Sequence, residues 1–202
     1  MSVWEARYVD GDTPWDSGEP SLELVRILEA HAIRPGRALE VGCGTGVNAV
    51  FLASRGFEVT ATDVSPTALA AAKKRAAEAA VDVMWVEADL LAAPDLGQGY
   101  DLVFDRGVYH VLRRGDAAPF LALLARVLRP GGLYVVLAGN ANDAGPADQG
   151  PPRVHAHELC AELQPLFDLV ELREFTWSGV RIVGREVSPL GWAGVLRRRA
   201  AP

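Results

Sequence analysis

Four side chains with acid, base or hydrogen-bonding chemistry follow an apolar stretch in YDLVFDRGVYHVL, which begins at position 100. Arg106 carries a permanent positive charge that would attract and orient an anionic acceptor. Asp105 would hold Arg106 or face a cofactor, and His110 could act as a general base because its unperturbed pKa lies near 6.5. We therefore predict Asp105, Arg106 and His110 as catalytic residues. Tyr109, together with Arg106 and His110, is predicted to line the substrate pocket.

A glycine-rich loop, EVGCGTG, lies further towards the N-terminus and carries Gly42, Gly44 and Gly46 in G-x-G-x-G spacing. Glycines allow positive φ angles and let a ligand approach the backbone closely. A dinucleotide-binding fingerprint would read G-x-G-x-x-G, but position 47 is valine. Asp63 follows Gly42 by 21 residues, the spacing of a carboxylate that binds ribose hydroxyls. The pattern favours an adenosine-type ligand without a pyrophosphate.

The glycine loop shares one property with Asp63, Asp89 and Asp105: each comes directly after a predicted strand. In doubly wound α/β sheets, ligands bind beyond the carboxyl ends of the strands. We therefore expect all four features to meet at one edge of a sheet.

The segment Glu40 to Gly46 resembles motif I of the class I S-adenosylmethionine-dependent methyltransferases, and Asp63-Val64 and Asp89-Leu90 match the acids after their second and third strands. The resemblance spans about residues 36–138. It implies S-adenosyl-L-methionine as methyl donor and S-adenosyl-L-homocysteine as product. The donor-binding residues that it implies are Glu40, Gly42, Gly44, Gly46, Asp63, Val64, Asp89, Leu90 and Asp105.

Two further segments resemble the thiopurine S-methyltransferase group and the related halide/thiol methyltransferases. They are the DRG at 105–107 with GPPRVHAHEL at 150–159, and TPWDSGEP at 13–20. The resemblance implies that an N-terminal segment folds over the donor, with Trp15 closing the pocket and Asp16 anchoring the segment. It also implies a small-molecule acceptor, with a thiol or another soft nucleophile favoured. The chain departs from the group in its short length and in VYHVL after the DRG.

Alternating strand and helix patterns predict the elements that position these residues. The expected fold is α/β: a Rossmann-like, doubly wound, seven-stranded and mostly parallel sheet with an antiparallel edge strand, plus an N-terminal helical cover. We expect one domain over 1–202, with a cover at 1–33 and the core at 34–202. The loop at 139–153 is predicted to form the second wall of the acceptor pocket. Strands are expected at 38–41, 58–63, 81–90, 101–105, 133–139, 168–175 and 191–199, and helices at 21–31, 47–54, 65–80, 116–128 and 157–166.

Composition excludes several classes of function. The 202 residues carry a net charge of −6 without a basic stripe, which disfavours nucleic-acid binding. Two cysteines build neither a disulfide framework nor a metal site, so we expect no metal. No signal peptide or membrane span is predicted, and a reducing, cytoplasmic location fits best. The partners expected are a small-molecule substrate and, at most, a second copy of the chain, as monomer or homodimer.

Three alternatives stay open at this stage. An oxygen or nitrogen methyltransferase of secondary metabolism would rely more on His110, because a hydroxyl needs deprotonation. A non-catalytic donor-binding module could use the same fold, since fold does not fix function. A nicotinamide-dependent enzyme is disfavoured by the valine at position 47.

Overall fold

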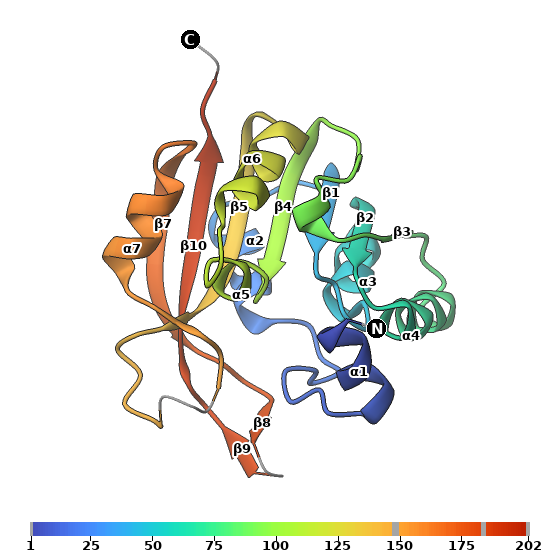
Figure 1. Ribbon diagram of the computed structural model, residues 1–202. Helices are drawn as coiled ribbons and strands as arrows, with labels where there is room; N and C mark the ends of the chain where they lie inside the picture. The colour runs from blue at the N-terminus through green and yellow to red at the C-terminus, as the bar shows by residue number, and fades with distance from the viewer. Residues whose placement is uncertain (1, 147–149, 183–184, 201–202) are drawn as a thin grey trace.

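The computed structural model describes residues 2–146, 150–182 and 185–200. It contains one main sheet with helices on both faces and a separate pair of short strands (Figure 1). The strands are β1 Arg37–Val41, β2 Glu58–Asp63, β3 Met84–Glu87, β4 Tyr100–Arg106, β5 Leu128–Asn140, β6 Arg153–Val154, β7 Phe167–Thr176, β8 Val180–Ile182, β9 Arg185–Val187 and β10 Leu190–Arg198. The helices are α1 Val3–Asp10, α2 Leu22–Ala30, α3 Val47–Ser54, α4 Pro66–Glu78, the 3₁₀ turn η1 Leu90–Ala92, α5 Tyr109–Leu112, α6 Ala118–Val127 and α7 Ala156–Leu163.

The main sheet confirms the predicted fold class. Its strand order is β3-β2-β1-β4-β5-β10-β7, and the short β6 pairs with β5. Neighbours from β3 to β5 are parallel, whereas β10 is antiparallel to both β5 and β7. The antiparallel strand therefore lies one place inside the edge, and β7 forms the edge itself. The three parallel strands β1, β2 and β4 have their carboxyl ends at the same end of the sheet.

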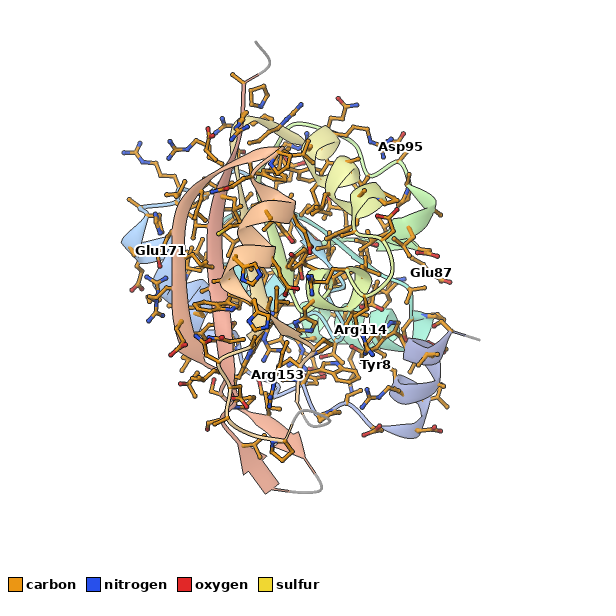
Figure 2. All side chains as sticks on the ribbon, turned by 60° about the vertical axis from the view of Figure 1, so that its left-hand side comes forward. Tyr8, Glu87, Asp95, Arg114, Arg153 and Glu171 are labelled. Atoms are coloured by element: carbon orange, nitrogen blue, oxygen red, sulfur yellow. The ribbon has the colours of Figure 1, made fainter. Side chains whose placement is uncertain are left out.

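Strand alternation divides the core between the two faces. Leu39, Val103 and Val136 face α5, α6 and α7, whereas Leu102 and Phe104 face α2 and α3. Side chains fill the space between the layers (Figure 2). Because both faces are covered, β1, β4 and β5 are buried almost throughout, as their apolar sequences predict.

Local sequence explains where α4 begins. The Ser65 side chain accepts a hydrogen bond from the Ala68 N–H, and Pro66 occupies the first helical turn, where its missing N–H costs nothing. The predicted cover at 1–33 divides into two parts. Helix α2 belongs to the helix layer, since Leu24 and Ile27 are fully buried against the sheet. Residues 2–20, called the lid segment below, hold α1, which has no buried residue.

Across the described residues, no helix has both the length and the apolar character that crossing a membrane requires.

Candidate active site

The glycine loop lies at the carboxyl end of β1, as predicted. Gly42, Gly44 and Gly46 have φ angles of 60°, 54° and 77°, a region that residues with side chains rarely adopt. A Cβ atom added to Gly44 would lie 2.6 Å from the Tyr8 hydroxyl oxygen of the lid segment. Both the backbone conformation and the close approach therefore require glycine here.

Asp63 lies beside this loop at the end of β2. One carboxylate oxygen accepts from the Gly44 N–H at 2.8 Å, and the other accepts from the Ser65 N–H at 2.9 Å. Burial raises the pKa of Asp63, and the three backbone N–H groups nearby oppose that change. The carboxylate is thereby fixed at the loop, with Val64 next to it in sequence.

The pair Asp89-Leu90 divides between surface and core. Asp89 is exposed and caps η1 through a hydrogen bond from the Leu91 N–H at 2.9 Å. Leu90 is 8% exposed and packs into the core on the α6 face. Of these two predicted donor-binding residues, Asp89 alone presents a side chain at the surface.

Glu40 is buried near the end of β1, and one of its two carboxyl oxygens has no protein partner. Its Oε1 accepts from the Asn48 side chain at 3.2 Å, and its Oε2 has no protein partner. Burial raises the pKa of Glu40 to about 8, and the Arg106 charge nearby acts in the opposite direction. A buried, unpaired carboxyl oxygen is costly, so this position fits a ligand that brings a hydrogen-bond donor or a positive charge.

Arg106 projects from the end of β4 on the same face as Glu40. Its Nη1 donates to the Trp15 carbonyl oxygen at 2.9 Å, and its guanidinium carbon lies 5.3 Å from the centre of the Trp177 ring. Its Nε is buried without a protein partner. Burial lowers the pKa of Arg106, and the Glu40 and Asp16 charges counter that effect. The guanidinium is thus held from two sides, and its Nε–H lies enclosed by protein without an acceptor.

The lid segment is fastened to the site by several polar contacts. Glu5 accepts from the Ser65 and Thr67 hydroxyls at 2.5 and 2.6 Å, at the start of α4. Asp16 accepts from the Thr45 hydroxyl of the glycine loop at 2.7 Å, which matches its predicted anchoring position. Trp15 donates through Nε1 to the Tyr8 hydroxyl at 3.1 Å. The Tyr8 hydroxyl, between Trp15 and Gly44, is therefore a second lid group next to the loop.

Asp105 has a different environment from the one predicted. It is fully buried and accepts from the Val108 and Tyr109 N–H groups at 2.7 and 3.0 Å and from the Tyr134 hydroxyl at 2.8 Å. Neighbouring residues of a strand point to opposite faces, so Asp105 faces the α5–α7 side while Arg106 faces the α2–α3 side. Asp105 does not pair with Arg106, and its carboxylate holds the turn that follows β4.

Tyr109 and His110 are likewise buried and hydrogen-bonded within the protein. Tyr109 is fully buried, and its hydroxyl donates to Glu162 of α7 at 2.7 Å. His110 Nδ1 accepts from the Gly139 N–H at 3.0 Å, and burial lowers its pKa to about 3. His110 is therefore neutral at physiological pH, and the lone pair on its Nδ1 already accepts the hydrogen bond from Gly139. This arrangement argues against the predicted role of His110 as a general base, because its other ring nitrogen, Nε2, carries the proton.

Sequence reasoning missed Tyr8, Asn48 and Trp177, which contact the motif residues from elements without a motif of their own. Helical periodicity could have placed Asn48 beside Glu40 at the first turn of α3, but nothing local marks Tyr8 or Trp177 as site residues. Among the described residues, no group of three His, Cys, Asp or Glu side chains could hold a metal ion.

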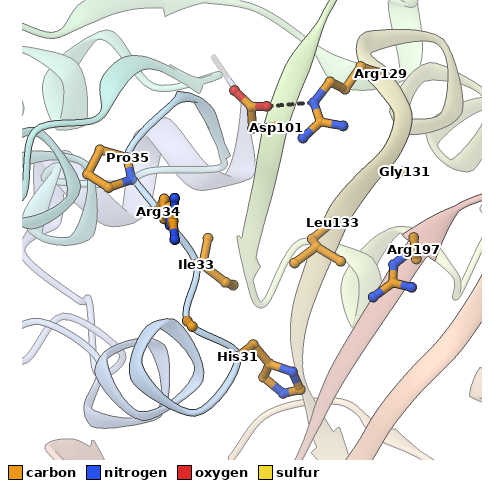
Figure 3. A pocket seen from close by; sticks show the side chains of 10 residues that line it. His31, Ile33, Arg34, Pro35, Asp101, Arg129, Gly131, Leu133 and Arg197 are labelled. Atoms are coloured by element: carbon orange, nitrogen blue, oxygen red, sulfur yellow. Dashed lines mark hydrogen bonds and ion pairs between the residues drawn. The ribbon is translucent and has the colours of Figure 1, made fainter.

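A hollow of about 310 Å³ lies at the other end of the strands, away from the glycine loop (Figure 3). It is lined at the starts of β4 and β5 by Asp101, Arg129 and Leu133, and Arg129 pairs with Asp101 at 2.6 Å. Arg197 reaches it from the end of β10. None of the predicted site residues lines it, so the chemistry of the motifs is confined to the other edge.

Comparison with known proteins assigns this architecture to a family. Residues 38–132 match the family described as "Methyltransferase domain", a span that contains the glycine loop, Asp63, Asp89 and Arg106. A solved structure from a study of the conversion of a disulfide bond into a thioacetal group during echinomycin biosynthesis is 27% identical. It matches with a TM-score of 0.83 over 98% of this chain and 92% of its own length.

Curated relatives point in the same direction. A probable thiol methyltransferase 2 of Arabidopsis thaliana is 29% identical over 66% of this chain. A 2-heptyl-1-hydroxyquinolin-4(1H)-one methyltransferase of Mycobacteroides abscessus is 29% identical over 72% of this chain. The chain spans 60% and 64% of the lengths of these two relatives. Residues 38–132 therefore form a methyltransferase domain, and on its fold, its glycine loop and these matches the chain is similar to S-adenosylmethionine-dependent methyltransferases.

Proposed function

We propose that the protein transfers a methyl group from S-adenosylmethionine to the sulfur of a small-molecule thiol. The observation that carries this proposal is the half-buried Arg106 guanidinium at the end of β4, whose Nε has no protein partner. The wider proposal, methylation of a small molecule, rests on the family and on the glycine loop. The relative named as a probable thiol methyltransferase supports sulfur as the acceptor atom.

The residues present fit the donor. The backbone of the glycine loop would contact the donor. Asp63 would accept hydrogen bonds from its ribose hydroxyls, and Asp89 would bind its adenine. Glu40 Oε2 offers the unpaired acceptor that a cationic ligand requires. When bound, the donor supplies a methyl group on a positively charged sulfur, which is electrophilic without further activation.

The chain's own contribution would be alignment, electrostatics and exclusion of water. Arg106 attracts the acceptor as an anion and favours a thiolate over a thiol. A thiolate forms near neutral pH and is a strong nucleophile, so no buried base is needed. The lid segment encloses the site through Tyr8, Trp15 and Asp16. Holding the two reactants in line supplies much of the rate, as in other bimolecular reactions on enzymes.

The two cysteines support a cytoplasmic location, since both Cys43 and Cys160 are free thiols. We expect a monomer or a homodimer, and a small molecule as the only substrate besides the donor.

Release of S-adenosylhomocysteine across an acceptor panel tests the proposed function. The panel contains alkyl and aryl thiols, hydrogen sulfide, iodide, a catechol and a primary amine. Turnover on the sulfur acceptors supports the proposal. Turnover only on the catechol or the amine would replace sulfur by oxygen or nitrogen while keeping the donor site.

Asp63→Ala is expected to weaken donor binding by about 1–3 kcal/mol, the loss of charge-assisted hydrogen bonds to the ribose. Isothermal titration with S-adenosylhomocysteine measures it. Asp82→Ala, an exposed acid outside the site, serves as the control. Unchanged affinity in Asp63→Ala would remove the ribose assignment.

Deletion of residues 1–20 is expected to raise the donor dissociation rate, because it removes the Tyr8, Trp15 and Asp16 contacts that enclose the loop. Stopped-flow displacement measures the rate, and circular dichroism checks that the remaining chain folds. Glu19→Ala, an exposed change on the same segment, should leave the rate as it is. Equal rates in deletion and full chain would mean that the lid segment does not retain the donor.

A further inference from the structure

The Asn48 side chain joins the end of the lid segment to the buried Glu40 carboxyl. Its Oδ1 accepts from the Ser21 N–H at 2.9 Å, and its Nδ2 donates to Glu40 Oε1 at 3.2 Å. Ser21 directly follows the lid segment and occupies the N-cap position of α2. Each of the three residues is at most 9% exposed. One side chain therefore connects the point where the lid segment meets the core with an acid at the donor edge.

The two partners fix the direction of the Asn48 amide. A backbone N–H can only donate, so the amide oxygen must face Ser21. The NH2 group then faces Glu40, where it needs an acceptor. A flipped amide would set N–H against N–H at Ser21 and oxygen against oxygen at Glu40. Because both contacts are buried, the flipped amide would leave polar groups unsatisfied, which is costly.

This amide direction decides which oxygen of Glu40 can hold a proton. Oε1 accepts from Asn48, so a proton on Glu40 must lie on Oε2, the oxygen without a protein partner. Burial raises the pKa of Glu40 to about 8, and the Asn48 hydrogen bond is the largest effect that opposes this change. At neutral pH, a ligand that brings a cation or an N–H group to Oε2 must therefore displace a proton.

The other charges near Glu40 come from neighbouring elements. Arg106 of β4 lowers the pKa of Glu40, as does the Ala49 N–H of α3, whereas Asp63 of β2 raises it. Burial and then the Glu40 charge raise the pKa of the Cys43 thiol in the glycine loop. Arg106 and Asp63 act on Glu40 through space and with opposite sign. The Asn48 hydrogen bond is thus the side-chain contact that orients the carboxyl.

We infer that Asn48 is a positioning residue for the methyl donor: it leaves Oε2 of Glu40 as the atom that meets the donor, and the Ser21 N–H at the end of the lid segment keeps it in that orientation. The inference rests on the proposed role of Glu40 in donor binding. Donor binding then releases the proton from Oε2 to water. Donor affinity therefore rises with pH until Glu40 is ionised in the free protein, and loss of either hydrogen bond moves that limit to higher pH.

The experiment measures the Kd of S-adenosylhomocysteine for the full-length protein from about pH 6 to about pH 10. The wild-type Kd is expected to fall by up to about tenfold per pH unit and to level off above about pH 8. Glu40→Gln cannot ionise and should remove this dependence. Asn48→Leu is expected to raise the levelling-off point by about one pH unit or more, because the carboxylate loses a hydrogen-bond donor. Asn48→Asp, which has nearly the same shape, should act in the same direction through its negative charge and guards against misfolding of the leucine variant.

Asn140 provides a matched control. It is fully buried, accepts from the Asn142 N–H at 2.7 Å and donates to Glu174 at 2.8 Å, so it has the same kinds of partner as Asn48. Asn140→Leu should leave the pH profile of the donor Kd unchanged. Circular dichroism of each variant checks that it folds.

Ser21 tests the connection to the lid segment. Its φ angle of −60° suits proline, so Ser21→Pro removes the N–H and leaves Asn48 and Glu40 in place. Ser21→Pro is expected to raise the levelling-off point, whereas Ser21→Ala keeps the N–H and should not. Identical profiles for these two variants would overturn the inference.

Two further results would also overturn it. If both Asn48 variants raise the Kd by the same factor at every pH, Asn48 has a structural role only. If the wild-type Kd does not depend on pH and Glu40→Gln leaves it unchanged, Glu40 does not meet the donor. Thiol methyl transfer is tested separately by the acceptor panel and would stand in either case.

Discussion

Replacing Arg106 by alanine is expected to lower kcat/KM for the acceptor by about 10- to 100-fold, since charge-assisted hydrogen bonds contribute about 1.5–3 kcal/mol. The Kd for S-adenosylmethionine should change by no more than about threefold on the same scale. The reason is position: Arg106 lines a cleft of about 660 Å³ beside the lid segment, where the Trp15 carbonyl and the Trp177 ring hold its guanidinium. Steady-state kinetics and titration with S-adenosylhomocysteine measure the two quantities separately.

Two further variants make the Arg106 result specific. Arg106→Lys keeps the charge but cannot reproduce the planar set of N–H donors, so an intermediate loss is expected. Arg129→Ala removes an arginine at the opposite edge of the sheet and should leave kcat/KM unchanged. Equal losses of acceptor turnover and donor affinity in Arg106→Ala would instead assign the guanidinium, beside Glu40, to the donor.

Asp105→Ala is expected to destabilise the fold by about 3 kcal/mol, because two backbone N–H groups and the Tyr134 hydroxyl would lose their buried acceptor. For a chain of this size that lowers Tm by about 6–12 °C. Thermal unfolding followed by circular dichroism measures the change. Asp116→Ala, which removes an exposed carboxylate that also accepts a backbone N–H, should cost much less. An unchanged Tm with lost turnover would return Asp105 to a catalytic role.

The sequence predicts the sheet and the donor edge well because both depend on local patterns. Apolar runs such as 38–41 and 133–139 mark strands covered on two faces, and the G-x-G-x-G spacing marks a backbone that only glycine adopts easily. Asp63 ends β2, and Asp89 lies two residues beyond the end of β3. Periodicity therefore suffices to bring these residues to one edge.

The acceptor side is predicted less well because it depends on which way each side chain points. Asp105 and Arg106 are neighbours in a strand and so must face opposite sides of the sheet, which prevents both from entering one pocket. Tyr109 and His110 start the short helix α5, whose direction is set by contacts with Glu162 and Gly139. These partners lie 53 and 29 residues away, and no local pattern announces them.

Elements without strong local signals escaped prediction for the same physical reason. Helix α1 has no buried residue, so its sequence carries no apolar stripe to mark it. The β8–β9 hairpin is two short strands outside the main sheet. Trp177 reaches Arg106 across 71 positions of sequence, a contact that only the completed sheet creates.

The segment at residues 15–21 belongs to two sites at once. It supplies the Trp15 carbonyl and the Asp16 carboxylate that accept from Arg106 and Thr45, and from Asp16 onward it also lines the cleft that Arg106 lines. A ligand that holds this segment in place lowers the cost of holding it for a second ligand. Donor and acceptor are then linked thermodynamically, and the factor by which one tightens the other is the same in both directions.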